Sequence, residues 1–225
     1  TPAITSSATA SVAENTTAVL TVTATDADLP AQTLTYSILG GADAAKFQID
    51  ANTGALSFIS APNFDAPTDA GGNNVFDVTV QVSDGAGGTA SQAIKVTVTP
   101  INDNLPVITS SATASVPENT TAVLTVTATD ADLPAQTLTY SITGGADASK
   151  FQIDASTGAL SFITAPDFEA PIDVGGNNIY DVTVQVSDGA GGTASQAIAV
   201  TVTPVNDNLP IITSSATATV PENTS

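Results

Sequence analysis

Residues 76–83 read FDVTVQVS, and apolar and polar side chains alternate strictly along them. One face of this stretch would carry Phe76, Val78, Val80 and Val82. A period of two is typical of a strand that has one buried face. The stretch therefore predicts a β-strand whose apolar side covers a core.

The same alternation recurs on both sides of this strand. It occurs at residues 20–24, 34–38, 47–49, 56–58 and 94–98, and a further strand is expected within 4–12. Turn sequences rich in glycine and asparagine separate these segments, and none of them has a helical period. Seven short antiparallel strands in about 100 residues are typical of an immunoglobulin-like, Greek-key β-sandwich, so the predicted fold class is all-β.

The whole pattern repeats with a period of 104 residues. Glu14, Glu118 and Glu222 lie in the matching segments SVAEN, SVPEN and TVPEN, and the two full copies differ at 15 positions. The predicted repeats are 1–104, 105–208 and, as the first strand of a truncated third copy, 209–225. Neighbours this similar suggest recent duplication within a long array.

The composition excludes several classes of function. Twenty-two acidic residues face three lysines, which gives a formal charge of -19. Such a surface repels nucleic acid and anionic lipid and favours cationic partners. Without Cys, His, Met or Trp, the chain has no disulfide, thiol nucleophile or histidine base. No apolar run of about 18 residues is present, so we expect no direct membrane insertion.

Acidic residues gather in five short motifs at the predicted strand ends. The motifs are Glu14-Asn15, Asp26-Ala27-Asp28, Asn63-Phe64-Asp65, Ser83-Asp84-Gly85 and Asn102-Asp103-Asn104, and each recurs 104 residues later. Loops gather at the poles of a sandwich, so these oxygens would meet there. Calcium takes six to eight oxygen ligands, which this set offers. Without a cation, carboxylates about 4 Å apart repel by roughly 1 to 4 kcal/mol.

In order and spacing these motifs resemble the cadherin repeat, whose PEN, DAD, DRE, Asp-x-Gly and DxNDNxP motifs supply calcium ligands. The resemblance implies calcium between neighbouring repeats. At the first junction it implicates Glu14, Asn63, Asp65, Asn102, Asp103, Asn104, Asp130, Asp132 and Asp188. Two half-sites would comprise Glu118, Asp167, Glu169, Asn206, Asp207 and Asn208 at the second junction, and Asp26, Asp28 and Asp84 at the N-terminal end.

The sequence also departs from the cadherin pattern. Pro100 and Pro204 replace the first aspartate of DxNDN, and the DRE pair is reduced to Asn63 and Asp65. The ion whose side-chain ligands are all kept is the one assigned to Asn102, Asp130, Asp132 and Asp188. Whether two or three ions bind at a junction stays open.

Other acidic residues have a plainer interpretation. Asp50 and Asp154 are expected to form turns. Solvated loops and strand faces are expected for Asp43, Asp69, Asp77, Asp147, Asp173 and Asp181. The aromatic residues Tyr36, Phe47, Phe58 and Phe76 lie on the inward phase of their strands and are expected in the core.

The function predicted from these features is mechanical. We expect calcium-stiffened repeats in an extracellular or cell-surface protein, as the stalk or extender of a large adhesin, bacterial given the similar copies and absent cysteine. The expected partners are calcium and neighbouring repeats of the same chain. The alternative is a binding module that recognises a polysaccharide, a cell-surface ligand or a second copy of the array. An enzyme is not expected, because no nucleophile and base pair is present and aromatic platforms for sugars are scarce.

Overall fold

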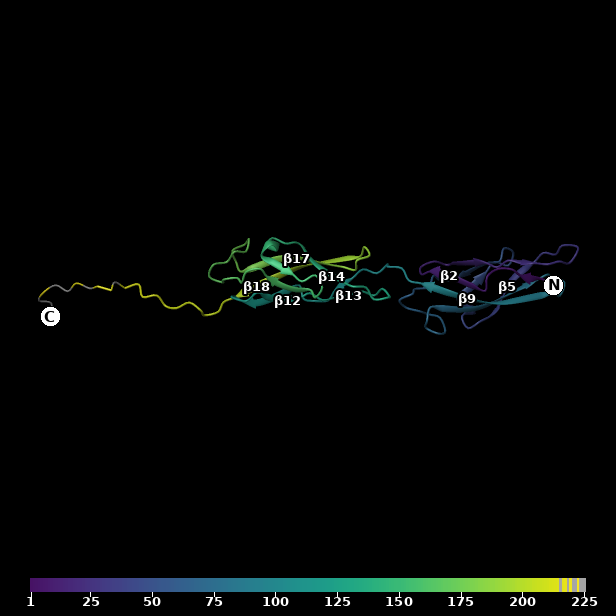
Figure 1. The fold of residues 1–225 in the computed structure, drawn as a ribbon, viewed down its shortest axis with the longest axis horizontal. Coiled ribbons are helices and arrows are strands. Elements are labelled where there is room, and N and C mark those ends of the chain that lie inside the picture. The colour runs from purple at the N-terminus through teal and green to yellow at the C-terminus, as the bar shows by residue number, and fades with distance from the viewer. Residues whose placement is uncertain (215, 218, 220–221, 223–225) are drawn as a thin grey trace. The chain divides into compact units, whose positions relative to one another are not determined.

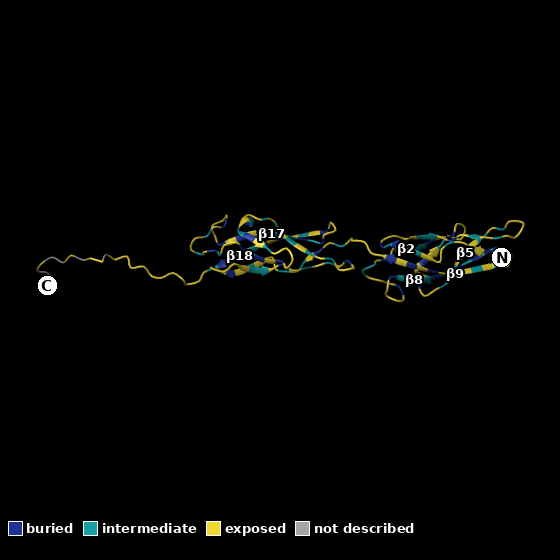
Figure 2. Ribbon diagram, viewed as in Figure 1, coloured by how far each residue is buried: buried dark blue, intermediate teal, exposed yellow. Residues whose placement is uncertain are grey.

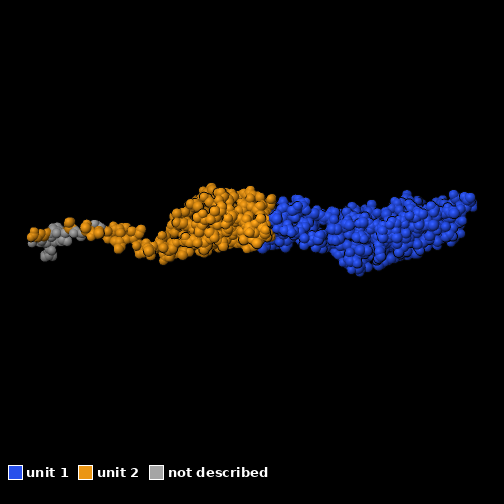
Figure 3. All heavy atoms as spheres, viewed as in Figure 1, with its two compact units in different colours: residues 1–109, 127–139, 186–194 blue, residues 110–126, 140–185, 195–225 orange. Residues whose placement is uncertain are grey.

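The computed structural model describes residues 1–214, 216, 217, 219 and 222 of the chain. They form two compact units, blue and orange in Figure 3. Unit 1 comprises residues 1–109, 127–139 and 186–194, and unit 2 comprises 110–126, 140–185 and 195–225. Two loops from the second repeat thus pack with unit 1. The repeat boundaries at 104 and 208 stay a prediction.

Residues 1–99 form nine strand segments and one short 3-10 turn (Figure 1). They are β1 (Ala3–Ile4), β2 (Thr9–Ala13), β3 (Ala18–Thr21), β4 (Ala24–Thr25), β5 (Thr35–Gly40), η1 (Ala44–Lys46), β6 (Phe47–Ile49), β7 (Ala55–Phe58), β8 (Val75–Ser83) and β9 (Thr89–Thr99). The sheet orders are β2-β9-β8-β5, β3-β7-β6 and β1-β4. The predicted all-β sandwich is therefore confirmed.

The first strand is not the single antiparallel strand that we expected at residues 4–12. It is split: β1 pairs antiparallel with β4, whereas β2 pairs parallel with β9. The chain changes sheets between the two pieces, and the expected strand at 20–24 is likewise divided into β3 and β4. Side-chain alternation is the same for both kinds of edge pairing, so the sequence pattern does not distinguish them.

The core lies where the alternation of β8 places it. Every second residue of β8 is buried (Figure 2). One of these residues is Phe76, and the aromatic rings of Phe47 and Phe58 pack against it. The Phe47 and Phe58 ring centroids are 4.5 Å apart, and those of Phe58 and Phe76 are 5.0 Å apart. Tyr36 is half-buried against this cluster. Burial of such side chains stabilises each by about 1.5 to 3 kcal/mol.

The second repeat forms the equivalent elements. They are β10 (Val107–Ile108), β11 (Thr113–Pro117), β12 (Ala122–Thr125), β13 (Ala128–Thr129), β14 (Thr139–Gly144), η2 (Ala148–Lys150), β15 (Phe151–Ile153), β16 (Ala159–Phe162), β17 (Ile179–Ser187) and β18 (Thr193–Thr203). Its sheet orders, β11-β18-β17-β14, β12-β16-β15 and β10-β13, match those of the first repeat. Tyr180 occupies the place of Phe76 in the aromatic cluster.

Four aspartates that we expected in solvated positions are buried instead: Asp43, Asp69, Asp147 and Asp173. Asp43 accepts hydrogen bonds from the backbone N–H groups of Ala70, at 2.7 Å, and Asp77, at 2.8 Å. The expectation was wrong because these carboxylates satisfy loop N–H groups that would otherwise have no partner. They fix the long loop that precedes β8 and its equivalent before β17.

The segment from residue 209 onward was expected to begin a third repeat. Residues 215, 218, 220, 221 and 223–225 lie outside the described part of the chain, and no strand is assigned among the others. In the second repeat the equivalent strand β11 pairs with β18, whose residues follow it by 86 positions. Among the described residues, no helix is long and apolar enough to cross a membrane.

Candidate metal centre

The predicted ligands of the first junction all lie in unit 1. Asn63 and Asp65 lie in the long loop between β7 and β8. The linker residues Asn102 to Asn104 follow β9, Asp130 and Asp132 follow β13, and Asp188 follows β17. We call this group of oxygen donors, together with Glu14 and Asp65, the linker cluster.

Hydrogen bonds join the linker residues to the loop aspartates. The Asn102 Nδ2 atom donates to Asp188 Oδ2 at 3.1 Å. The backbone N–H of Asn104 donates to Asp132 Oδ1 at 3.1 Å, and its Nδ2 atom lies 2.6 Å from the same oxygen. The Asn104 amide also donates to Asp65 Oδ2 at 2.9 Å. The structure therefore brings these predicted ligands together.

Glu14, Asp65 and Asp103 form the other side of the linker cluster. One carboxylate oxygen of each lies within 4.8 Å of the others. Glu14 is 1% exposed and accepts hydrogen bonds from the backbone N–H groups of Phe64, at 2.7 Å, and Ile101, at 2.8 Å. These bonds hold one carboxylate at the start of the linker whether or not a cation is bound.

Asp188 is held by a glycine turn of its own. Its carboxylate accepts hydrogen bonds from the backbone N–H groups of Ala190, Gly191 and Gly192. A Cβ atom at Gly192 would lie 2.1 Å from Asp188 Oδ2, so only glycine permits this approach. The N–H of Ala190 makes the largest contribution in lowering the pKa of Asp188, and the Asn102 amide adds to it against the opposing effect of burial. The carboxylate is thus kept ionised.

Asp132 is also buried and ionised. Asp132 is only 2% exposed. Burial alone would raise the pKa of Asp132, but hydrogen bonds from the side chain and backbone of Asn104 lower it below the ordinary value. Its neighbour Asp130 has a buried Oδ2 atom with no hydrogen-bond partner in the described part of the chain. A buried, unpaired carboxylate oxygen is costly unless a cation or another donor meets it.

The Asn63 side chain forms hydrogen bonds within its own loop. Its Oδ1 atom accepts hydrogen bonds from the backbone N–H groups of Asp65, at 2.7 Å, and Ala66, at 3.2 Å. The amide thereby stabilises its own loop. Asp167 does the same for Glu169 and Ala170 in the second repeat.

The second-junction residues lie in unit 2. Oxygens of Glu118, Asp167 and Glu169 are within 4.8 Å of one another. Backbone N–H groups of Phe168 and Val205 lower the pKa of the Glu118 carboxyl. Burial raises the pKa of Glu169, and the charges of Glu118 and other nearby carboxylates raise it further. Asn206, Asp207 and Asn208 are exposed, and Asn119 Nδ2 donates to Asp207 Oδ2 at 2.6 Å.

The N-terminal group of Asp26, Asp28 and Asp84 is also assembled, with oxygens within 4.8 Å of one another. The Asp26 Oδ2 atom is buried and has no hydrogen-bond partner among the described residues, as at Asp130. The ammonium group of Thr1 lies 2.8 Å from Asp28 Oδ2 and 3.4 Å from Asp26 Oδ1.

Sequence reasoning missed two residues that donate hydrogen bonds to the linker cluster. The Asn15 Nδ2 atom donates to Asp103 Oδ2, and Asn15 adopts a left-handed φ of 60° that asparagine tolerates. The Gln136 Nε2 atom donates to Asn102 Oδ1 at 3.0 Å. Asn15 could have been found from the Glu-Asn motif, but no motif points to Gln136. Its recurrence as Gln32 does not single it out, because nearly every residue recurs after 104 positions.

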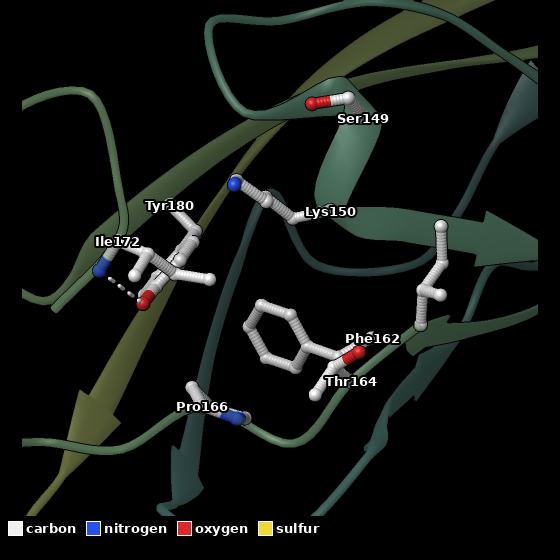
Figure 4. Close-up of a pocket in the computed structure, with 8 residues that line it drawn as sticks. Ser149, Lys150, Phe162, Thr164, Pro166, Ile172 and Tyr180 are labelled. Atoms are coloured by element: carbon white, nitrogen blue, oxygen red, sulfur yellow. Dashed lines mark hydrogen bonds between the residues drawn. The ribbon is translucent and has the colours of Figure 1, made fainter. Parts of the chain in front are cut away.

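A separate hollow lies beside the aromatic cluster of the second repeat. Figure 4 shows it between Lys150, Phe162 and Tyr180, and the Tyr180 hydroxyl accepts a hydrogen bond from the backbone N–H of Ile172 at 3.3 Å. The first repeat has an equivalent hollow next to Phe76, which lacks the hydroxyl. No acidic residue lines either hollow, so they are not proposed as cation sites.

The residues of the linker cluster fit a divalent cation. The linker cluster contains six carboxylates and two amides, and oxygens of three of the carboxylates, Glu14, Asp65 and Asp103, lie within 4.8 Å of one another. The described structure shows no lysine in an ion pair with any of them. The donors are oxygen atoms, which suit calcium and exclude a thiolate site. The unpaired Asp130 Oδ2 atom is the clearest sign of a missing positive partner.

The chain is similar to known proteins of the cadherin group. Cadherin-related family member 2 of Mus musculus is 34% identical over 188 residues, which are 81% of this chain but 14% of that protein. The crystal structure of mouse Cadherin-23 EC22-24 is matched with a TM-score of 0.65 and 26% identity over 91% of this chain and 65% of that one. Human Protocadherin-24 EC1-2, at a TM-score of 0.71 and 21% identity, shares the fold over 91% of this chain and 98% of that chain.

A family model identifies the family of this chain. A model of the cadherin domain matches residues 8–99 and again 112–203, which together make up most of the chain. The resemblance predicted from the motifs is confirmed, and so is the extracellular or cell-surface location that it implied. The chain spans a small part of the curated relative's length. This chain belongs to the cadherin domain family.

Proposed function

We propose that the chain is a calcium-binding structural or adhesion segment, in which calcium at the linker cluster stiffens an array of repeats. The observation that supports this most is the linker cluster itself. The buried carboxylates of Asp132 and Asp188 accept hydrogen bonds from linker residues, and the Asp130 Oδ2 atom is buried without a hydrogen-bond partner in the described part of the chain. Cadherin domains are adhesion domains, so catalysis is not part of the proposal.

Two groups of residues would hold the ions. One ion would be held by Asn102, Asp130, Asp132 and Asp188. A second position, with one ion or two, would use Glu14, Asp65, Asp103 and the Asn104 region. Six carboxylate charges balance up to three divalent ions, and the missing carboxylates at Asn63 and Pro100 favour fewer.

The mechanical effect follows from where these ligands are attached. The linker follows β9, while Asp130, Asp132 and Asp188 are carried by the loops after β13 and β17. A cation shared by these groups would replace their repulsion by ligation and restrict the backbone of the linker. Extracellular sites of this class bind at roughly 0.1 to 1 mM, so they would fill outside a cell.

The test is a calcium titration of the 225-residue chain. The thermal midpoint and the small-angle scattering profile would be recorded in EDTA and with calcium up to a few millimolar. We expect a higher midpoint and a narrower distance distribution with calcium, both lost in Asp132→Asn and Asp188→Asn. Asp181→Asn, which removes one charge from an exposed strand position, is the matched control. Absence of any calcium response in the wild-type chain would overturn the proposal.

The finer form of the proposal is the stalk or extender of a large adhesin. Near-identical neighbouring repeats support a long array, and the bacterial origin expected from them stays a prediction. The half-sites at Asp26, Asp28 and Asp84 and at Glu118, Asp167 and Glu169 would be completed by further repeats.

Self-association is the second candidate. Ile163 and Ile172 line the hollow of Figure 4 and are 57% and 54% exposed. Exposed apolar side chains at one place favour a protein contact. Sedimentation of the chain with and without calcium tests it, and Ile172→Thr restores the residue that the first repeat has at this position. A calcium-dependent dimer lost in this variant would support adhesion by the second repeat.

A further inference from the structure

Gln136 lies beside the linker cluster but belongs to none of its acidic motifs. It is found in the loop between β13 and β14, four residues beyond Asp132. Its Nε2 atom donates to Asn102 Oδ1 at 3.0 Å. Its own Oε1 atom is buried and has no hydrogen-bond partner in the described part of the chain. The nitrogen of the Gln136 amide thus has a hydrogen-bond partner, whereas its buried oxygen has none.

The contact fixes which way the Asn102 amide faces. With Oδ1 bound to Gln136, the Nδ2 atom faces Asp188 Oδ2 at 3.1 Å. An N–H donor suits a bare carboxylate, but it cannot be a ligand of a cation. For Asn102 to offer oxygen on the Asp188 side, its amide must turn over, which exchanges the positions of Oδ1 and Nδ2.

A turned Asn102 amide would then present Nδ2 to Gln136. Two N–H groups facing each other would leave both without an acceptor, at a cost in a half-buried site. Gln136 avoids this if its amide turns as well, because the Oε1 atom that now has no partner becomes the acceptor. Each orientation of one amide therefore selects one orientation of the other.

We propose that Gln136 is a positioning residue for the cation site, and that the two amides turn together when a cation binds. This inference rests on the proposed function. In the cation-free arrangement Gln136 directs the Nδ2 atom of Asn102 toward Asp188. In the cation-bound arrangement the Gln136 Oε1 atom accepts from Nδ2 and directs the Asn102 oxygen toward the cation.

The equivalent residue of the first repeat provides an internal comparison. Gln32 has the same neighbours in sequence, and its Oε1 atom is also buried without a partner among the described residues. No hydrogen bond joins Gln32 to an asparagine among the described residues. A substitution at Gln32 thus changes the same side chain in the same local setting without touching the Asn102 amide.

The decisive experiment is a calcium titration of the whole chain with four variants. Gln136→Met keeps the length of the side chain but removes the amide, and we expect calcium affinity at the linker to fall by about tenfold. Gln136→Glu can only accept, which favours the cation-bound orientation of Asn102, so its affinity should equal or exceed that of the wild type. Gln136→Asp adds the same charge but does not reach Asn102, so it should bind more weakly than Gln136→Glu. Gln32→Met should bind as the wild type does.

Side-chain amide NMR provides a readout that a merely structural role would not change. The NH₂ resonances of Asn102 and Gln136 should shift together on calcium addition, and in Gln136→Glu the Asn102 resonances should lie near the calcium position already in EDTA. If the wild type responds to calcium but Gln136→Met binds equally well, the positioning role is refuted and the proposed function stands. If Gln136→Asp matches Gln136→Glu, charge alone explains the effect and the inference is also refuted. A wild type without a calcium response removes both.

Discussion

Asp103→Asn should have opposite effects on stability with and without calcium. Oxygens of Glu14, Asp65 and Asp103 lie within 4.8 Å of one another. Because Asp103 is exposed, the dielectric constant of bulk water applies, and each pair at that separation repels by about 0.9 kcal/mol. Asp103 takes part in two of the three pairs, so its neutralisation relieves about 1.7 kcal/mol when no cation is bound.

Part of this gain is offset by lost hydrogen bonding. Asn15 and Asn104 both donate to the Asp103 carboxylate, and an asparagine there keeps one oxygen for the two donors. Losing one such bond costs about 0.5 to 1.5 kcal/mol. The net stabilisation in EDTA is then about 0.7 kcal/mol, which raises the midpoint of a chain of this size by about 2 °C. In calcium the variant lacks a charged ligand, so calcium should raise its thermal midpoint by less than it raises that of the wild type.

Differential scanning calorimetry in EDTA and in millimolar calcium measures both effects, the higher midpoint without calcium and the smaller rise on calcium addition. Asp181→Asn is the control, since it removes the same charge from an exposed position on β17. A midpoint for Asp103→Asn below that of the control in EDTA would contradict the repulsion argument. A full calcium gain in the variant would contradict its place among the ligands.

Three further predictions concern hydrogen bonds that are present without a cation. Glu14→Ala should destabilise unit 1 by about 2 to 4 kcal/mol even in EDTA, because two loop N–H groups lose their acceptor, and urea unfolding measures this. Asp147→Ala should cost a similar amount in unit 2, with no change in calcium affinity by calorimetric titration. Backbone N–H groups of the following turns lower the pKa of Asp50 and Asp154. Their ionised forms therefore stabilise the fold above about pH 4, and this stability is lost as the pH falls through the folded-state values. When both residues are replaced by asparagine, the thermal midpoint should depend less on pH between about pH 5 and pH 3. A pH dependence equal to that of the wild type would contradict this.

The strands were predictable because their side-chain alternation is a direct consequence of backbone geometry. The apolar face of β8 needs no tertiary information, and neither does the 104-residue period. The split of the first strand was not predictable, since β2 looks the same whether its partner β9 runs parallel or antiparallel. Edge pairing depends on contacts about 86 residues away, which local patterning does not encode.

The site was predictable in its motifs but not in its contacts. Motif order placed Asp132 and Asp188 near the linker, because loops at one end of a sandwich meet. The burial of Asp43 and the amide contact of Gln136 were missed for a common reason. A polar side chain with a backbone or amide partner has no sequence signature, because its partner is chosen by the fold.

The arrangement of donors indicates which part of the chain would respond to calcium. Glu14 and Asp188 are each held by backbone N–H groups of their own loops, so their positions do not depend on a cation. Asn102 and Asn104 instead contact the loop aspartates through side-chain amides and one linker N–H, which are the contacts that ligation would replace. None of these polar residues belongs to the buried hydrophobic core of the first repeat. Removal of calcium should therefore loosen the linker while each sandwich stays folded, and hydrogen exchange should locate the change at residues 100–105 rather than in β8 or β17.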